Sequence, residues 1–374
     1  MAAATKLTTI VVLGASFAGL GVAHSLLKTH KDIKVVMIAP TAELYWNLAS
    51  VRAIIPGQLS DDKLFKDVAT GFKQYGPESF EFTLGTAIAI EPDEKRVNIN
   101  TANGNHMLDY DHLVIATGSR ASGDFPWKSS LEGSSQTKQL LHDFQGKVNA
   151  AKSIVIAGAG PTGVETSAEI AFEYKDKEIT LINAGKTVLV GLPPSVIKFA
   201  ENTLKSMNIK LVLDTKIVSD TVLENGSIEL TLSNGEKLVT DLYLPTIGVT
   251  PNTEYVPKAF LNERGDVVVD EFLQVRGTTN IWAAGDVVDC QPSQMTYATN
   301  QAKALAKNLD RVLKGQKPVV YKTDGSPMLA VTLGRSKGTG RFGNMKLPSF
   351  VINMVKGKTL FTEKLPKYVD GSEF

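Results

Sequence analysis

The chain carries one glycine-rich pattern twice, and this repetition constrains the fold more than any other feature of the sequence. The first copy spans residues 10–19 and the second residues 154–163, with their first glycines at Gly14 and Gly158. In each copy, an apolar run typical of a buried strand ends in glycines that permit a tight turn, the close approach of a pyrophosphate and the start of a helix. Each copy therefore predicts a dinucleotide-binding unit.

A second apolar run follows each pattern at the same distance. Residues 34–39 end as far from Gly14 as residues 178–183 end from Gly158. A strand–helix–strand unit needs such spacing because the helix must return the chain to the sheet before the second strand begins. We therefore expect an α/β protein with two Rossmann-like domains, each binding a different dinucleotide.

Composition and cysteine usage exclude several other classes. The 374 residues suit two or three domains, and 40 basic residues against 39 acidic ones give no overall attraction to nucleic acid. The single cysteine, Cys290, cannot form an intramolecular disulfide, and an isolated thiol is usually inert packing. The five histidines lack the spacing of metal ligands, so we expect no metal site.

The order of the motifs resembles that of flavoproteins with two dinucleotide-binding domains. An Ala-Thr-Gly turn at 116–118 separates the two glycine patterns, and a Gly-Asp pair at 285–286 follows the second. Within that superfamily the chain is most similar to the apoptosis-inducing-factor and ferroptosis-suppressor group, cousins of type II NADH:quinone oxidoreductases. The closer resemblance lies in residues 47–53, 158–165, 334–340 and 356–361.

The resemblance implies a glutathione-reductase-like flavoprotein fold with a small C-terminal module. The FAD-binding domain would be discontinuous, comprising residues 1–121 and 266–318, with the NAD(P)H-binding domain at 122–265. The C-terminal module, 319–374, would face the acceptor site or a membrane. A linker is expected over 118–135 and a helix over about 293–313, and Asn234-Gly235 predicts a hairpin turn.

By this resemblance the first glycine pattern holds FAD. Asp286 would accept a hydrogen bond from the ribityl chain, and Asn47 and Arg52 would lie near the flavin or its phosphates. A turn aspartate, a cap asparagine and a surface arginine are the alternatives. Ser16 replaces the usual middle glycine, and Ala39 stands where an acidic residue usually binds the adenine ribose. The residues expected at FAD are Gly14, Ala15, Ser16, Phe17, Ala18, Gly19, Asn47, Arg52, Ala87, Thr117, Gly118 and Asp286.

The second glycine pattern would hold NADH or NADPH. Glu165 resembles the family glutamate that reaches the nicotinamide side, the alternative being a carboxylate that stabilises the helix N-terminus. Asn183 ends the second strand, where an acid would favour NADH and an arginine NADPH, so the choice stays open. The residues expected at NAD(P)H are Gly158, Gly160, Pro161, Thr162, Gly163, Glu165, Asn183 and Gly248.

The missing thiol narrows the chemistry. Related disulfide reductases and peroxidases carry redox cysteines in the segment that is here 44–48, which has none. The resemblance thus implies an FAD-dependent NAD(P)H oxidoreductase that passes hydride through flavin N5 directly to a quinone-type acceptor. Glu165, Lys356 and Phe361 would be its catalytic groups, with Tyr297 nearby, because a lysine and an aromatic ring can polarise and stack on a quinone.

Other functions and locations stay open. A redox-sensing interaction protein like apoptosis-inducing factor would turn over slowly, and a ferredoxin or rubredoxin reductase would pass single electrons to an iron protein. The segment 344–367 combines apolar clusters with five lysines, which suits either an anionic membrane surface or docking on the protein's own body. We expect a cytoplasmic protein, free or peripheral on intracellular membranes such as mitochondrial or lipid-droplet membranes. A homodimer is an open possibility.

Overall fold

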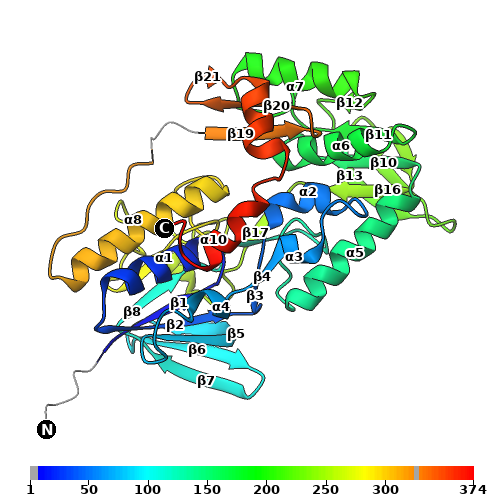
Figure 1. The fold of residues 1–374 in the computed structure, drawn as a ribbon. Helices are drawn as coiled ribbons and strands as arrows, with labels where there is room; N and C mark the ends of the chain where they lie inside the picture. Colours follow the sequence, from blue (N-terminus) through cyan, green and yellow to red (C-terminus); the bar gives the residue numbers. More distant parts are fainter. Residues whose placement is uncertain (1–6, 324–327) are drawn as a thin grey trace, which may run out of the picture.

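The computed structural model describes residues 7–323 and 328–374, and its largest sheet is built on the first glycine pattern (Figure 1). β1 (Thr8–Leu13), α1 (Phe17–Thr29) and β2 (Ile33–Ala39) form the predicted strand–helix–strand unit, with β1 and β2 parallel. The strand order is β18-β8-β1-β2-β5-β6-β7, in which the last two pairings are antiparallel. The other strands are β5 (Phe80–Glu91), β6 (Arg96–Thr101), β7 (Gly104–Asp109), β8 (His112–Ile115) and β18 (Ile281–Ala283).

The second glycine pattern builds a parallel sheet of its own. β10 (Ser153–Ala157), α6 (Pro161–Glu173) and β11 (Glu178–Ile182) repeat the first unit, in a sheet of order β12-β11-β10-β16. The predicted Asn234-Gly235 turn joins two antiparallel strands, β14 and β15, and Gly235 has the positive φ that such turns favour. The remaining strands here are β12 (Lys210–Val212), β13 (Ile217–Val222), β14 (Ile228–Leu232), β15 (Lys237–Thr240) and β16 (Leu242–Pro245).

Two short strands, β9 (Ser119–Ala121) and β17 (Val249–Pro251), pair where the chain passes between the two large sheets. The linker that follows β9 is bound on both sides. Asn47 Nδ2 donates to the Trp127 carbonyl over 3.0 Å, and the Trp127 indole donates to the Pro245 carbonyl over 2.8 Å. The linker therefore connects η1 (Asn47–Ala49) with the end of β16 in the second sheet.

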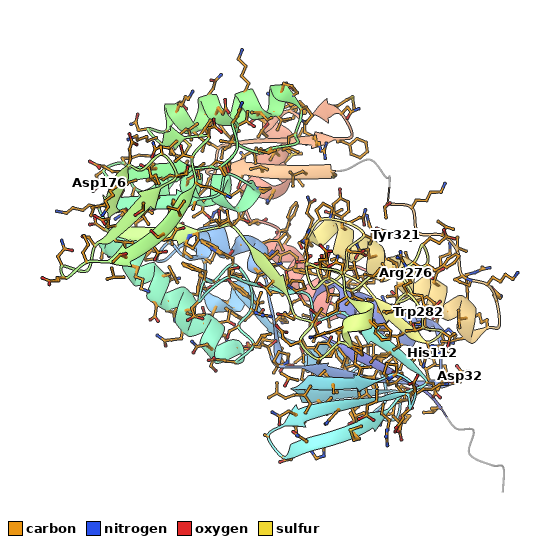
Figure 2. The ribbon with its side chains drawn as sticks, turned by 180° about the vertical axis from the view of Figure 1, so that it is seen from behind. Asp32, His112, Asp176, Arg276, Trp282 and Tyr321 are labelled. Atoms are coloured by element: carbon orange, nitrogen blue, oxygen red, sulfur yellow. The ribbon has the colours of Figure 1, made fainter. Side chains whose placement is uncertain are left out.

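Helices cover the first sheet and close its core. The predicted helix over 293–313 is confirmed as α8 (Met295–Leu313), which packs against α1 where a Cβ on Gly21 would lie 2.9 Å from Ala302 Cβ. Trp282 on β18 is fully buried in the same core (Figure 2). The remaining elements of the first 318 residues are β3 (Glu43–Tyr45), η1 (Asn47–Ala49), α2 (Ser50–Ala53), α3 (Asp61–Leu64), β4 (Phe65–Asp67), α4 (Ala69–Phe72), α5 (Ser134–Ala150), α7 (Pro194–Ser206) and η2 (Lys258–Phe260).

The C-terminal region spans both halves of the molecule. Its antiparallel sheet β19-β20-β21 lies beside α6 and α7, whereas its last helix, α10, lies near α1 (Figure 1). Domain boundaries drawn from the sequence stay a prediction. The elements of this region are β19 (Met328–Leu333), β20 (Lys337–Phe342), β21 (Met345–Lys346), α9 (Ser349–Ile352), the π-helical turn η3 (Asn353–Gly357), η4 (Thr362–Lys364) and α10 (Leu365–Val369).

The last ten residues pack into the core beside the first glycine pattern. The buried Tyr368 ring lies 5.3 Å from the Phe17 ring and 5.4 Å from the Trp46 ring, centroid to centroid. His24 Nε2 donates to the Val369 carbonyl over 2.8 Å, and burial lowers the pKa of His24 to about 4, which keeps the imidazole neutral near pH 7. The tail thus docks on the protein's own body.

We predict that Tyr368→Ala lowers the free energy of unfolding by about 3–5 kcal/mol, the range for removing a buried aromatic ring. The variant also loses the hydrogen bond between the Tyr368 and Thr299 hydroxyls. Phe350→Ala is the control, because that ring is 72% exposed, and it should change stability by less than about 0.5 kcal/mol. Urea denaturation measures the free energy of unfolding of both variants. Equally small decreases in the two variants would contradict the packing of the tail in the core.

Candidate functional site

A cavity of about 820 Å³ is lined by residues 13–18 of the first glycine pattern and by Pro161 and Thr162 of the second. The N-terminal ends of α1 and α6 both open on it, together with the C-terminal ends of β1, β2 and β8, where α/β sheets usually bind ligands. The C-terminal region closes one wall. The predicted residues that line it are Gly14, Ala15, Ser16, Phe17, Ala18, Asn47, Ala87, Thr117, Gly118, Pro161, Thr162, Glu165, Gly248, Asp286, Lys356 and Phe361.

The first and third glycines of each pattern are required by packing within the protein. A Cβ on Gly14 would lie 2.2 Å from the Ala116 carbonyl oxygen, and Gly14 also has a φ of +108°. A Cβ on Gly19 would lie 1.9 Å from the Gly14 oxygen, and one on Gly163 would lie 1.8 Å from the Gly158 oxygen. These glycines therefore let each helix pack directly on the turn before it.

Gly160, the middle glycine of the second pattern, differs from the other two. It precedes α6 with φ −71°, and a Cβ there would meet no atom of the described residues within 4 Å. The protein itself therefore has no packing need for glycine at this position. Bare backbone at the start of a helix is what the close approach of a diphosphate requires, so the geometry fits a dinucleotide. Ser16, exposed before α1, stands at the matching place in the first pattern.

Asp286 lies at the cavity and forms an ion pair that the sequence did not reveal. Its Oδ2 accepts from Lys128 Nζ over 2.5 Å and, more distantly, from Ser119 Oγ over 3.4 Å. Lys128 also lines the cavity, although it belongs to the stretch that we read as a linker. A lysine in a linker is usually solvated, and no motif around it pointed to Asp286, which is distant in sequence.

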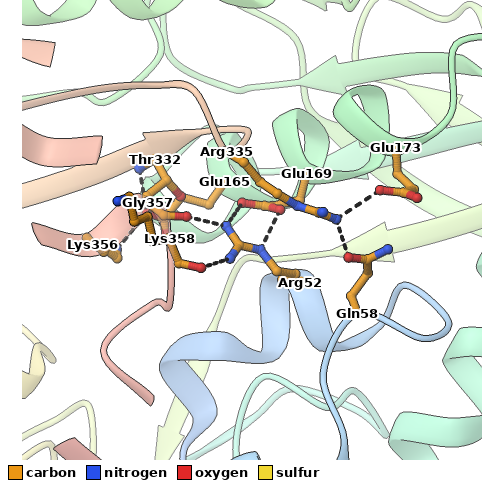
Figure 3. A network of polar contacts seen from close by, with 10 residues as sticks. All are labelled: Arg52, Gln58, Glu165, Glu169, Glu173, Thr332, Arg335, Lys356, Gly357 and Lys358. Carbon is orange, nitrogen blue, oxygen red and sulfur yellow. Dashed lines mark hydrogen bonds and ion pairs between the residues drawn. The ribbon is translucent and has the colours of Figure 1, made fainter. Parts of the chain in front are cut away.

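Glu165 and Lys356 meet in the wall of the cavity (Figure 3). Glu165 Oε1 accepts from Lys356 Nζ over 2.6 Å and from the Thr332 amide over 2.7 Å. Lys356 Nζ also donates to the Ala330 carbonyl over 2.9 Å. Both charged side chains are buried, so each needs the partner it has. Phe361 lines the same cavity.

Arg52 departs from our expectation that it lies at the flavin or its phosphates. Neighbouring Ser50 and Val51 line the cavity, but the Arg52 side chain points to α6 instead. Its Nε and Nη2 donate to the Glu169 carboxylate over 2.8 and 2.7 Å. Its Nη1 donates to the Lys358 carbonyl over 2.9 Å, and Nη2 also reaches the Gly357 carbonyl. With these bonds made, the guanidinium holds protein groups together.

Several other residues do not line the cavity: Asn183, Tyr297 and Cys290, and also the glycines Gly19, Gly158, Gly160 and Gly163 of the two patterns. The Asn183 amide donates to the Thr187 carbonyl over 2.8 Å, so its side chain braces the loop after β11. Tyr297, which we expected near the acceptor, does not line the cavity, whereas its neighbours on α8 do. Burial and the nearby Asp289 raise the pKa of the Cys290 thiol to about 11, which keeps it protonated and unreactive at neutral pH.

The part of the chain that the structure describes has neither a metal-binding cluster nor a membrane-spanning helix. Among residues 7–323 and 328–374, no cluster of three or more His, Cys, Asp or Glu side chains could hold a metal ion. In the same part of the chain, no helix combines the length and the apolar character that a membrane span requires.

Residues 8–302 match the family described as pyridine nucleotide-disulphide oxidoreductase. The chain belongs to this family. It is 45% identical over 370 residues to oxidoreductase ptaL of Pestalotiopsis fici, covering 97% of this chain and 99% of that protein. Ferroptosis suppressor protein 1 of Xenopus tropicalis is 30% identical over 366 residues, covering 95% and 94%. The sulfide:quinone oxidoreductase of Aquifex aeolicus has a TM-score of 0.81 at 17% identity, covering 97% and 92%.

These matches confirm the predicted fold and the resemblance to the ferroptosis-suppressor group. As a member of its family, the oxidoreductase uses FAD and NADH or NADPH. We propose the division between sites that the sequence predicts, with FAD at the start of α1 and beside Asp286, and the nicotinamide dinucleotide at the start of α6. The bare backbone at Gly160 and the carboxylate of Asp286 suit a diphosphate and a polyol respectively.

We predict that Gly160→Val weakens NAD(P)H binding without unfolding the oxidoreductase, because the added side chain occupies only the approach of the ligand. Titrating the flavin-loaded variant with NADH or NADPH should require at least about tenfold more nucleotide for half-reduction. Gly163→Ala is the contrasting control: its Cβ would press on the Gly158 carbonyl, so it should lose stability. Normal titration of the Gly160 variant would contradict the assignment of the second pattern.

We predict that Asp286→Ala loses FAD more readily, because a charge-assisted hydrogen bond contributes about 1.5–3 kcal/mol. Asp289→Ala is the matched control, since Asp289 is an exposed carboxylate only three residues away that does not line the cavity. The flavin content after extended dialysis measures the effect. Equal retention in both variants would show that Asp286 does not hold FAD.

Proposed function

We propose that this oxidoreductase passes electrons from NAD(P)H, through FAD, to a quinone-type acceptor bound beside Glu165, Lys356 and Phe361. The observation that carries the proposal is the buried Lys356–Glu165 pair in the wall of the cavity onto which both glycine patterns open. When bound, FAD supplies the two-electron exchange between the nicotinamide and the acceptor. The tasks of the protein are then to bind the acceptor, polarise it and exclude competing chemistry.

Among the described residues, the Lys356 ammonium donates two hydrogen bonds, which leaves one of its protons for this purpose. An ammonium group carries three protons, and two of those of Lys356 point to Glu165 and to the Ala330 carbonyl. The third can be donated to an acceptor oxygen in the cavity, where the surrounding protein strengthens the interaction. Glu165 and Ala330 thereby hold a charged donor in one place before the acceptor arrives.

Phe361 is held against the cavity by an unusual backbone. Leu360 and Phe361 are consecutive residues with left-handed φ values of 51° and 61°. Bulky residues adopt this conformation at a cost of about 1–3 kcal/mol each, and such strain collects at functional sites. The strain is offset by the buried Leu360 side chain and by the Trp46 indole, which donates to the Leu360 carbonyl over 2.9 Å. The aromatic ring is therefore placed to stack on a planar acceptor.

A route through a cysteine is disfavoured. The cavity is lined by described residues that do not include Cys290, and the raised pKa of Cys290 keeps its thiol in the unreactive form. We propose direct transfer from the flavin to a bound small molecule. The structurally similar sulfide:quinone oxidoreductase is named for a quinone acceptor. This similarity of fold supports a quinone as the acceptor in the proposal.

We further propose that the protein can lie at a membrane surface through its C-terminal region. Phe350 and Met354 are largely exposed on α9 and the π-helical turn η3, and Val355, the next residue, lines the cavity. A membrane-soluble acceptor could enter along this apolar edge. Self-association as a homodimer stays a prediction.

We predict that Lys356→Met lowers kcat for a short-chain quinone about 10²-fold, as the loss of one preorganised donor does, and that Phe361→Ala mainly raises KM. Reduction of the flavin by NAD(P)H should persist in both variants. Lys346→Met is the matched control, because this lysine belongs to the same region but does not line the cavity. Steady-state assays with a panel of quinones measure kcat and KM for each variant. Quinone turnover by Lys356→Met at the wild-type rate would contradict the proposed acceptor site.

A further inference from the structure

Helix α6 presents three glutamates at successive turns, and each pairs with a cation from a different segment (Figure 3). We call these pairs the α6 ladder. Side chains four residues apart lie on one face of a helix, so the three carboxylates form a row. The rungs are Glu165–Lys356 at 2.6 Å, Glu169–Arg52 at 2.7 Å and Glu173–Arg335 at 2.9 Å.

The middle rung is the most deeply buried of the three. The Arg52 side chain is 4% exposed and that of Glu169 is fully buried, whereas both members of the Glu173–Arg335 rung are 34% exposed. A fully buried ion pair is weak evidence for stability, because desolvation opposes the attraction between the charges. Its clearest effect is on geometry, since a displaced partner would leave an uncompensated buried charge.

Arg52 also binds the chain directly after Lys356. Its guanidinium donates to the carbonyls of Gly357 and Lys358 over 2.8 and 2.9 Å while it forms the two-point contact with Glu169. Lys356 and Gly357 are the last two residues of the π-helical turn η3, a rare backbone geometry that occurs mostly as a single turn. One planar side chain from α2 thus ties this turn to α6.

We infer that Arg52 is a positioning residue that acts with Glu169 to hold the η3 turn against α6, and so keeps the Lys356 ammonium on Glu165 at the cavity wall. The Glu165–Lys356 and Glu169–Arg52 contacts lie one helical turn apart on α6, so fixing the Arg52 contact also constrains the position of Lys356. A lysine at position 52 could keep the positive charge. It lacks the planar guanidinium that donates at once to the Glu169 carboxylate and to the backbone carbonyls of Gly357 and Lys358. The catalytic part of this inference rests on the proposed function; the geometric part does not.

Chemical labelling of Lys356 tests the geometric part. Flavin-loaded protein is treated with acetic anhydride, and mass spectrometry of peptides compares acetylation of Lys356 with that of the exposed Lys186. In Arg52→Met, Lys356 should be acetylated about tenfold faster than in wild type, because the turn that protects it opens more often. Arg52→Lys and Glu169→Gln should give smaller increases in the same direction.

Arg335→Met is the matched control. It removes an arginine–glutamate rung from the same helix but leaves the η3 turn bound, so acetylation of Lys356 should stay within about twofold of wild type. Thermal unfolding identifies which variants are folded. If Arg52→Met does not fold, Arg52→Lys and Glu169→Gln carry the test.

Kinetics test the catalytic part. In Arg52→Met, kcat for a quinone should fall about tenfold with KM little changed, while reduction of the flavin by NAD(P)H stays within about twofold of wild type. Arg52→Lys should restore part of kcat. Unchanged acetylation of Lys356 in the folded Arg52 and Glu169 variants would overturn the inference, as would an equal increase in Arg335→Met. If wild type reduces no quinone, the proposed function fails, and the labelling result still decides the role of Arg52.

Discussion

The row of ion pairs along α6 is the constraint on which the shape of the site depends. α6 begins at the second glycine pattern, Arg52 comes from α2 in the segment that follows β3, and Lys356 comes from the C-terminal region. The cavity has its wall where these three parts meet. The Glu165–Lys356 and Glu169–Arg52 pairs are buried, so separating either pair would leave an uncompensated charge in the protein interior. The two pairs therefore hold α6, α2 and the C-terminal region in one arrangement.

The C-terminal region contributes to both halves of the protein for the same reason. Its sheet packs on α6 and α7, its π-helical turn is tied to α2, and its tail packs Tyr368 against Phe17 and Trp46. The chain end is also bound, since Lys28 Nζ donates to the carbonyls of Gly371 and Phe374 over 2.6 and 3.0 Å. The residues that close the cavity are therefore anchored on either side of it.

Features with a local physical cause could be predicted from the sequence. The glycine patterns, their second strands, the Asn234-Gly235 turn and α8 follow from short-range steric and periodic rules. The positions of Arg52 and Lys128 could not, because each is set by a partner more than 100 residues away, Glu169 and Asp286. The sequence predicts only a linker over 118–135, whereas Lys128 of this stretch lines the cavity. The roles assigned to the other cavity residues stay predictions.

Double-mixing stopped-flow spectroscopy without oxygen separates reduction of the flavin by NAD(P)H from its reoxidation by a quinone. The flavin-loaded protein is first mixed with NADH or NADPH and then with a short-chain quinone, while the visible absorbance of oxidised FAD is followed. We expect the absorbance to fall after the first mixing and to return rapidly after the second, in a phase that is slower in Lys356→Met. A reduced protein that persists unchanged in the presence of quinone would contradict it.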